Sequence, residues 1–297
     1  MPKLTILTTT YNRAYLLHKC FESLYNQTCT DFEWLIIDDG STDNTEEIVE
    51  SIVRQKNRFS IKYVKKQNGG KHTALNYSHQ HISGKYLLML DDDDRLTKDA
   101  VETVLNDWAI YDDNETIGCI SYQKADLKTY KPLVEWKGKK PIVSNTIDFR
   151  VNPCRNGDCA EVVRTKVFIE YPAPIFEGEN FLAEDFLWIN SAYKYDTVYI
   201  RKIIYLCEYR TDGLTNAKSL NRLKNPMGGM YTCNLYFDHR FSLRVQIKKA
   251  ILYDCYALAT INPVRNLKRS KSFIKCLLLL PEAWLIYRSW LNKQMGK

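Results

Sequence analysis

Cysteine and histidine motifs for metal binding are missing from this 297-residue sequence. Its nine cysteines include no C-x-x-C pair and its five histidines show no ligand spacing, so we expect no structural zinc site. No apolar h-region of a signal peptide follows Met1-Pro2-Lys3, and we therefore expect no secretory signal, a cytoplasmic location and reduced thiols. No apolar run is long and continuous enough to predict a transmembrane helix.

A glycine-rich phosphate-binding loop is missing too. Gly69-Gly70-Lys71 lacks the G-x-x-x-x-G-K spacing of such a loop. The segment from Thr8 to Arg13, at the end of the first predicted strand, contains no glycine at all. The sequence therefore does not predict a P-loop.

Acidic residues are scarce in the C-terminal part of the chain. Residues 216–297 carry 3 acidic and 15 basic residues, whereas residues 1–215 carry 32 acidic and 27 basic residues. The total charge of +7 thus combines a mildly acidic body with a strongly basic tail. Such a tail predicts an anionic partner surface, either membrane lipid or nucleic acid, and the acidic clusters of the body argue against nucleic acid.

Four consecutive carboxylates, Asp91 to Asp94, follow an apolar segment, Tyr86 to Leu90, that is typical of a strand buried on both faces. Adjacent acids repel one another, which makes each harder to ionise unless a cation or hydrogen-bond donors are present. Aspartate oxygens suit Mn²⁺ or Mg²⁺, and these ions suit a nucleotide diphosphate. The alternative is a solvated acidic turn that begins the next helix.

Strand and helix patterns alternate through the first 110 residues. Apolar patterns predict strands at 3–10, 33–37, 60–65 and 86–90, with helices between them. This order is typical of an α/β fold with a Rossmann-like, mostly parallel sheet and helices on both faces. In such sheets, ligands bind beyond the carboxyl ends of the strands. We therefore expect one crevice to contain the polar clusters Thr9 to Arg13, Asp38-Asp39, Lys71 and Asp91 to Asp94.

The remaining patterns are weaker. Ser41 or Thr42 is expected to cap the helix after the second strand. We predict strands at 118–122 and 198–205, assign no structure to 123–155, and expect a hinge at 225–230. Glu184 and Asp185 stand at the start of a predicted helix, where they either serve in catalysis or cap the helix.

Two helices are predicted in the basic C-terminal region, at 241–259 and 271–291. The second carries an apolar stripe beside basic residues, formed by Phe273, Leu277, Leu280, Trp284 and Leu291. This pattern favours a helix lying in the membrane interface, with Trp284 and Trp290 as anchors. Alternatively, the stripe packs on the protein core or forms an oligomer contact.

Several motifs in a fixed order resemble those of the family 2 glycosyltransferases, which have a GT-A fold. They are Thr8-Thr9-Thr10-Tyr11-Asn12-Arg13, Tyr25-Asn26-Gln27-Thr28, Ile36 to Asp43, Leu90 to Asp94, and Glu184-Asp185. The resemblance covers residues 1–215 and implies a GT-A catalytic domain for the nucleotide-sugar and the acceptor. Residues 216–297 are expected to form a helical, membrane-associating extension.

The resemblance implies nucleotide-binding roles for the first motifs. Thr9, Tyr11 and Asp39 match the positions that hold the uracil and ribose of a UDP-sugar, and Thr10 lies between two of them. Arg13 and Lys71 match contacts to the nucleotide or its phosphates.

The later motifs imply a metal site and a catalytic base. Asp91 and Asp93 match the D-x-D motif, with Asp93 as the direct ligand of Mn²⁺ or Mg²⁺. Asp91 or Asp92 is expected to contact ribose and water. Asp185 matches the catalytic base, and Glu184 is a second catalytic candidate beside it.

These roles imply an inverting, metal-dependent hexosyltransferase that moves one sugar from a UDP-sugar to a saccharide acceptor. A metal ion stabilises the departing diphosphate, and one base without a covalent intermediate gives inversion. With the basic tail, we expect a peripheral enzyme on the inner face of the cell membrane. Its acceptor would be a polyprenyl-diphosphate-linked intermediate of O-antigen, capsule or exopolysaccharide synthesis.

Other functions remain as alternatives. A sugar nucleotidyltransferase also combines a Rossmann-like half with a metal, but it is expected to carry a glycine-rich basic loop near the N-terminus. A protein that binds a nucleotide or an anionic surface without catalysis is the alternative from another class.

Overall fold

A computed structural model describes residues 1–155, 157–208 and 223–295 of the chain. Within them, one sheet contains the strands β1 (Leu4–Thr10), β2 (Phe32–Asp38), β3 (Ser60–Lys65), β4 (Tyr86–Met89), β5 (Arg95–Leu96), β6 (Ile117–Asp126), β7 (Ile142–Ser144), β8 (Cys159–Arg164) and β9 (Asp196–Cys207). The helices are α1 (Ala14–Tyr25), α2 (Thr45–Val53), α3 (Lys71–Ser78), α4 (Ala100–Tyr111), α5 (Thr165–Glu170), α6 (Asp185–Ser191), α8 (Pro226–Asn234), α9 (Leu243–Leu258), α10 (Pro263–Leu267) and α11 (Phe273–Met295).

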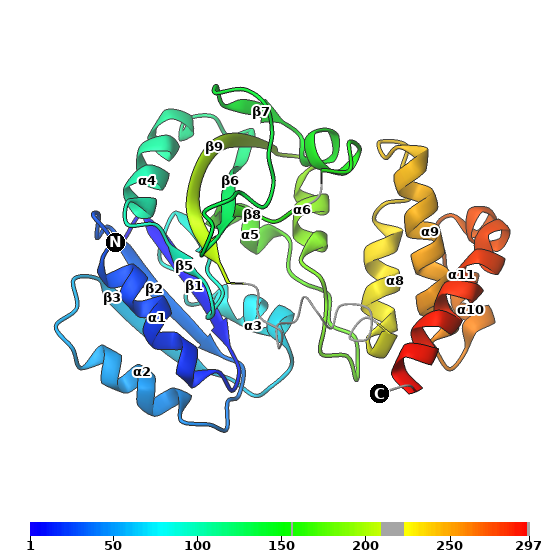
Figure 1. Cartoon of the computed structure of the whole chain (residues 1–297), viewed down its shortest axis with the longest axis horizontal. Coiled ribbons are helices and arrows are strands. Elements are labelled where there is room, and N and C mark those ends of the chain that lie inside the picture. The colour runs from blue at the N-terminus through cyan, green and yellow to red at the C-terminus, as the bar shows by residue number, and fades with distance from the viewer. Residues whose placement is uncertain (156, 209–222, 296–297) are drawn as a thin grey trace.

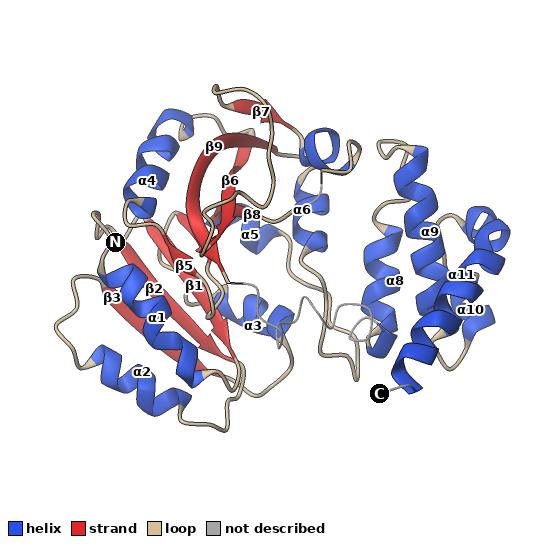
Figure 2. Cartoon of the chain, viewed as in Figure 1, coloured by secondary structure: helices blue, strands red, loops and turns tan. Residues whose placement is uncertain are grey.

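The sheet is mixed, and its strand order is β3-β2-β1-β4-β8-β6-β9-β5, with β7 paired to β9 (Figure 2). The four strands β3, β2, β1 and β4 are parallel, whereas β8 runs antiparallel to its neighbours β4 and β6. The carboxyl ends of β1, β2 and β4 therefore lie at one edge of the sheet, where the sequence predicts the crevice.

Alternation along the strands divides the apolar side chains between two cores. On β2, Trp34 and Ile36 belong to one core, and Leu35 and Ile37 belong to the other. Helices α1, α2 and α4 contribute to the first core, and α3, α5 and α6 contribute to the second. The prediction of helices on both faces of the sheet is therefore confirmed.

The predicted cap of α2 by Ser41 or Thr42 is wrong. Helix α2 begins at Thr45 without a side-chain cap. Ser41 instead accepts a hydrogen bond from the Asn12 backbone N–H (2.9 Å), and the Thr42 N–H donates to Asn12 Oδ1 (2.7 Å). Residues 123–155, to which no structure was assigned from the sequence, contain the end of β6, all of β7 and a short π-helix, Ile147–Val151. Strand β7 pairs with β9 far along the chain, a partner that local periodicity does not reveal.

The C-terminal helices α8 to α11 pack together on one side of the sheet (Figure 1). The predicted hinge at 225–230 is wrong, because α8 begins there. Pro226 is its first residue, a position that needs no N–H, and Gly229 lies so close to α9 that a Cβ would sit 2.6 Å from the Tyr256 ring. The predicted domain boundary at 215/216 and the segment Tyr209 to Gly213 lie outside the described residues.

Helix α11 packs one face on α9 and exposes the other. Cys276 and Ala283 on the packed face are fully buried. Trp290 lies on this side, with its ring 6.5 Å from the Tyr256 ring, so its prediction as a membrane anchor is wrong. The opposite face exposes Phe273, Ile274, Leu277, Leu278, Trp284 and Leu285. None of the helices in the described part of the chain has the length and hydropathy that a membrane crossing requires.

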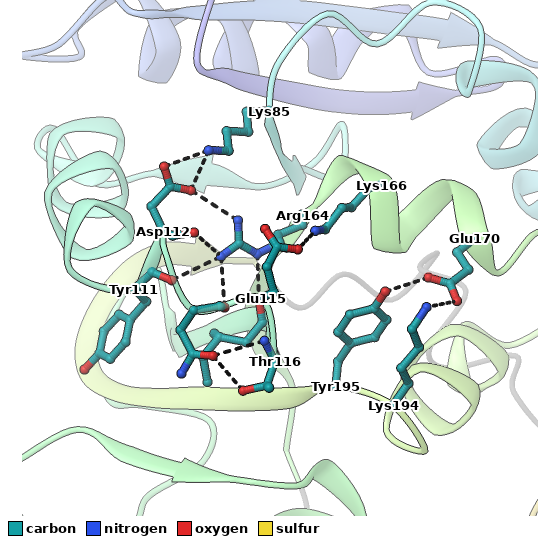
Figure 3. Close-up of polar contacts among 12 residues, drawn as sticks. Lys85, Tyr111, Asp112, Glu115, Thr116, Arg164, Lys166, Glu170, Lys194 and Tyr195 are labelled. Carbon is teal, nitrogen blue, oxygen red and sulfur yellow. Dashed lines mark hydrogen bonds and ion pairs between the residues drawn. The ribbon is translucent and has the colours of Figure 1, made fainter.

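Arg164 ties the opposite edge of the sheet to α4 (Figure 3). It is buried at the end of β8, paired in register with Tyr86 at the start of β4. Its guanidinium donates to the backbone oxygens of Tyr111 (3.1 Å), the last residue of α4, and of Asp112 (2.9 Å), which follows it. Because cations stabilise helix C-termini, this buried arginine serves the fold and lies away from the predicted crevice.

Candidate active site

The carboxyl ends of β1, β2 and β4 open on a cavity of about 1210 Å³. Its lining includes each residue predicted for the site: Thr9, Thr10, Tyr11, Arg13, Asp39, Lys71, Asp91, Asp92, Asp93, Glu184 and Asp185. Asp38 does not line it, because this buried carboxylate accepts hydrogen bonds from the Ser41 N–H (2.7 Å) and the Tyr63 hydroxyl (2.6 Å). Segments far apart in the sequence thus meet in one cavity, while the individual roles stay predictions.

Asp39 is held by the loop that precedes α3. Its carboxylate pairs with Lys66 Nζ at 2.6 Å and accepts hydrogen bonds from the backbone N–H groups of Gly69 (3.1 Å) and Gly70 (2.7 Å). Gly70 has a φ of 91°, and a Cβ there would lie 1.9 Å from the Asn180 carbonyl oxygen, so only glycine fits. The orientation of Asp39 is therefore fixed by the fold.

Arg13 connects the polar cluster after β1 to the acids after β4. Its Nη1 lies 2.8 Å from Asp92 Oδ1 and 3.2 Å from Asp93 Oδ2. Thr10 Oγ1 also donates to Asp92, at 2.8 Å. Burial raises the pKa of Asp92 to about 6, although Arg13 and Thr10 act in the opposite direction. Asp92 is thus engaged in internal contacts, and the more exposed Asp93 is better placed to meet a ligand.

Lys71, the first residue of α3, lies between two carboxylates from distant parts of the chain. Its Nζ is 2.7 Å from Asp91 Oδ1 and 2.8 Å from Glu184 Oε1. Burial acts to raise the pKa of Asp91, but Lys71 and the neighbouring Lys124 outweigh it and lower this pKa to about 2. Asp91 is therefore ionised and available as an anionic ligand.

The acids after β4 have suitable donor atoms for a divalent cation. Burial, followed by the negative charge of Asp91, raises the pKa of Asp94 to about 7. Among the described residues, no group of three potential ligands forms a complete metal site. A Mn²⁺ or Mg²⁺ ion commonly takes one or two carboxylates and completes its shell with phosphate oxygens and water. Asp93 and Asp91 fit that mode of binding.

Asp185 opens helix α6 and contacts the C-terminal helices. The Tyr236 hydroxyl donates to Asp185 Oδ2 at 2.8 Å, and Lys249 Nζ of α9 lies 3.4 Å from the same oxygen. The alternative role as a helix cap finds no support, because α6 has no side-chain cap and the Glu184 carboxylate pairs with Lys71 instead. Asp185 is partly exposed and lines the cavity.

Several residues of the cavity follow no motif and were missed by the sequence analysis. Arg150 pairs with Glu161 at 3.0 Å, and burial raises the pKa of Glu161 to about 7. Arg244 and Lys248 of α9 also line the cavity. They reach it only because α9 packs beside the site, and a single sequence contains no signal for that packing.

The fold of the chain is that of the GT-A glycosyltransferases. Over 99% of this chain and 84% of the other, it matches the mannosyltransferase PcManGT from Pyrobaculum calidifontis, solved with GDP-Man and Mn²⁺, with a TM-score of 0.60 and 18% identity. It also matches S. aureus TarS 1-349, solved in complex with UDP-GlcNAc, with a TM-score of 0.58 and 16% identity over 95% of this chain and 80% of that one. The predicted fold class is therefore confirmed.

The sequence itself identifies the family. The model for glycosyl transferase family 2 matches residues 5–169, and the chain belongs to this family as a hexosyltransferase. A similar curated protein is the GalNAc(5)-diNAcBac-PP-undecaprenol beta-1,3-glucosyltransferase of Campylobacter jejuni subsp. jejuni serotype O:2. The two are 27% identical over 287 residues, which span 93% of this chain and 87% of the relative.

Proposed function

We propose that the chain transfers one sugar from a UDP-sugar to a saccharide acceptor, with inversion and with the help of a divalent metal. The observation that carries this proposal is the single cavity lined by Asp39, Asp93 and Asp185, which come from three separate parts of the chain. The GDP-Man and Mn²⁺ of the mannosyltransferase structure, and the UDP-GlcNAc of the TarS structure, support a nucleotide-sugar donor.

The donor binds on the side of the cavity formed by the ends of β1, β2 and β4. In this proposal, Thr9, Tyr11 and Asp39 hold the nucleoside, and Arg13 and Lys71 attract the diphosphate. Asp93, with Asp91, would hold a Mn²⁺ or Mg²⁺ ion, and such an ion would supply positive charge that stabilises the leaving diphosphate. The Arg13 and Lys71 cations already lie within 3.2 Å of these acids, so they add positive charge at the same place.

The acceptor hydroxyl is deprotonated by Asp185. As the proton passes to the carboxylate, the hydroxyl oxygen forms a bond to C1 of the sugar and the bond from C1 to the diphosphate oxygen breaks. One base and one displacement invert the anomeric carbon, so an α-linked donor gives a β-linkage. Glu184, fixed by Lys71, contributes negative charge beside the base.

We propose that the acceptor is a polyprenyl-diphosphate-linked intermediate of a bacterial surface polysaccharide. The name of the Campylobacter relative, which includes a PP-undecaprenol substrate, supports this class. The preferred location is the cytoplasmic face of the cell membrane, where such an acceptor is anchored. No part of this proposal requires nucleic acid.

The exposed face of α11 is proposed to lie on the anionic membrane surface. Ile274 and Leu278 are each 73% exposed, and Trp284 lies on the same side of the helix. Large exposed apolar patches mark interaction sites, and a basic amphipathic helix binds anionic lipid. The C-terminal region also reaches the cavity through Tyr236 and Lys249, so we propose that residues 216–297 serve both the membrane contact and the active site.

A donor screen tests the proposal. Purified protein is incubated with Mn²⁺ or Mg²⁺ and a panel of UDP-sugars, and released UDP is measured with and without a lipid-linked saccharide extract. We expect one UDP-sugar to give metal-dependent UDP release that the acceptor stimulates. Absence of binding and release for the whole panel would contradict the proposed donor class.

A further inference from the structure

A row of cations on helix α9 faces the cavity. Arg244, Lys248 and Lys249 all line it, and Arg244 and Lys248, which are four residues apart, lie on the same side of the helix. Lys249 is the member of this row that pairs with an acid, Asp185. Within the described parts of the chain, Arg244 and Lys248 form no ion pair.

This arrangement works against the stability of the helix. Arg244 lies in the first turn of α9, which contains no acidic residue, and a cation is unfavourable at that end of a helix dipole. Arg244 and Lys248 are four residues apart, so their like charges repel. An anion bound in the cavity would remove both penalties.

A further cation lies in the segment before β8. Arg155 lines the same cavity, with its guanidinium 4.1 Å from the centre of the Phe149 ring. Asp158 is also in this part of the wall, and its charge acts on Arg150. Arg150 is already paired with Glu161, and the three cations Arg155, Arg244 and Lys248 outnumber Asp158, so this part of the wall keeps a net positive charge.

We propose that Arg244 and Lys248, assisted by Arg155, bind the diphosphate of the lipid-linked acceptor, an inference that rests on the proposed function. Lys248 adjoins Lys249, which contacts the proposed base Asp185, so an anion at Lys248 lies close to the reacting hydroxyl. Arg244 is about 6 Å further along the helix. The acceptor favoured by this geometry therefore carries few sugars between its diphosphate and its nucleophilic hydroxyl.

Calorimetric titration with farnesyl diphosphate tests the subsite. The protein is first saturated with UDP and Mg²⁺, so that the donor side of the cavity is filled. We expect the wild type to bind farnesyl diphosphate and the double variant R244Q/K248Q to bind it at least about tenfold more weakly, with unchanged affinity for UDP. The control R265Q/K268Q removes two exposed cations of the α10 region outside the cavity, and it should bind both ligands like the wild type.

Three results would overturn the inference. Farnesyl diphosphate affinity equal in the wild type and R244Q/K248Q would show that these cations bind no diphosphate. A parallel loss of UDP affinity would assign them to the donor. Equal affinity for farnesol, or for inorganic pyrophosphate, would contradict a lipid-linked diphosphate. If the wild type fails to bind UDP, the proposed donor class is contradicted instead. The comparison of farnesyl diphosphate affinity between the wild type and R244Q/K248Q still tests the diphosphate subsite in that case.

Discussion

The Tyr236 hydroxyl lies 2.8 Å from Asp185 Oδ2 and connects the C-terminal helices to the proposed catalytic base. Lys249 approaches the same oxygen at 3.4 Å, and its Nζ lies 3.6 Å from the centre of the Tyr236 ring. Tyr236 itself is buried among Ile189, Phe241 and Val245, so its position depends on the packing of α9 against α6. The basic C-terminal region therefore forms part of the cavity wall, in addition to carrying the exposed face of α11 that we propose contacts the membrane.

Tyr236→Phe should lower kcat by about tenfold, because one hydrogen bond that orients Asp185 is lost while the ring packing is kept. UDP affinity should not change, since Tyr236 contacts the proposed base Asp185 and none of the residues proposed to hold the nucleotide. Steady-state kinetics with UDP titration measures both quantities. The matched control is Tyr130→Phe at an exposed position; a kcat for Tyr236→Phe as high as that of this control would exclude the orienting role.

Asp185→Asn should abolish transfer while leaving UDP binding intact, because the amide cannot accept the proton of the acceptor hydroxyl. Glu184→Gln, one residue earlier, is the comparison: it should retain part of the activity, since Glu184 contacts Lys71 and not the acceptor in our proposal. Transfer assays with both variants decide this assignment. Full activity of Asp185→Asn would remove Asp185 from the mechanism.

Asp254→Asn should increase stability at neutral pH. Asp254 is fully buried in α9, neither of its carboxylate oxygens accepts an N–H or O–H hydrogen bond within the described residues, and burial raises its pKa to about 7. The unfolded state releases this proton near pH 4, so the free energy of unfolding should fall as the pH rises from about 4 to 7. The free energy of unfolding should be lower by roughly 3–4 kcal/mol at pH 7 than at pH 4 because of this one group. Urea unfolding at pH 4.5 and 7.5 measures it, and an equal pH dependence in Asp254→Asn would refute this origin.

Substitutions on the exposed face of α11 should reduce membrane binding. Removal of residues 264–297 is an unsuitable test, because Cys276 and Ala283 are buried against α9 and their loss would open that core. The triple variant I274Q/L278Q/L285Q keeps the packed face. We expect it to lose binding to anionic liposomes in flotation assays, whereas I110Q/I175Q, which changes exposed residues elsewhere, should bind normally. Undiminished flotation of the triple variant would defeat the anchor proposal.

The fold, and the residues that line the proposed donor side of the cavity, could be predicted from the sequence because both depend on local patterns. Strands β1, β2 and β4 are short segments rich in apolar and β-branched residues, and polar residues follow each of them, so the rule for parallel sheets places Asp39 and Asp91 at one edge. The residues that pair with these acids were harder to predict from the sequence. Arg13 belongs to a motif and Lys71 to a polar position expected at the crevice, but Lys66, which pairs with Asp39, belongs to neither.

The acceptor side could not be predicted in the same way. The proposed acceptor side includes Tyr236, Lys249 and Arg244, which lie more than 40 residues after α6 in the chain. They reach the cavity because the C-terminal helices pack beside α6, and a single sequence carries no local sign of such contacts. The Gly228-Gly229 pair was misleading for a physical reason. These glycines allow α8 to approach its neighbours closely, whereas the same pair in an unpacked segment favours a hinge.

The most direct test of the central claim is calorimetric titration of UDP with and without Mn²⁺ into the wild type, Asp93→Ala and the exposed-site control Asp113→Ala. If Asp93 holds the metal that meets the diphosphate, Mn²⁺ should strengthen UDP binding in the wild type and in Asp113→Ala by a large factor, and should give no gain in Asp93→Ala. An equal gain from Mn²⁺ in all three proteins would contradict the account.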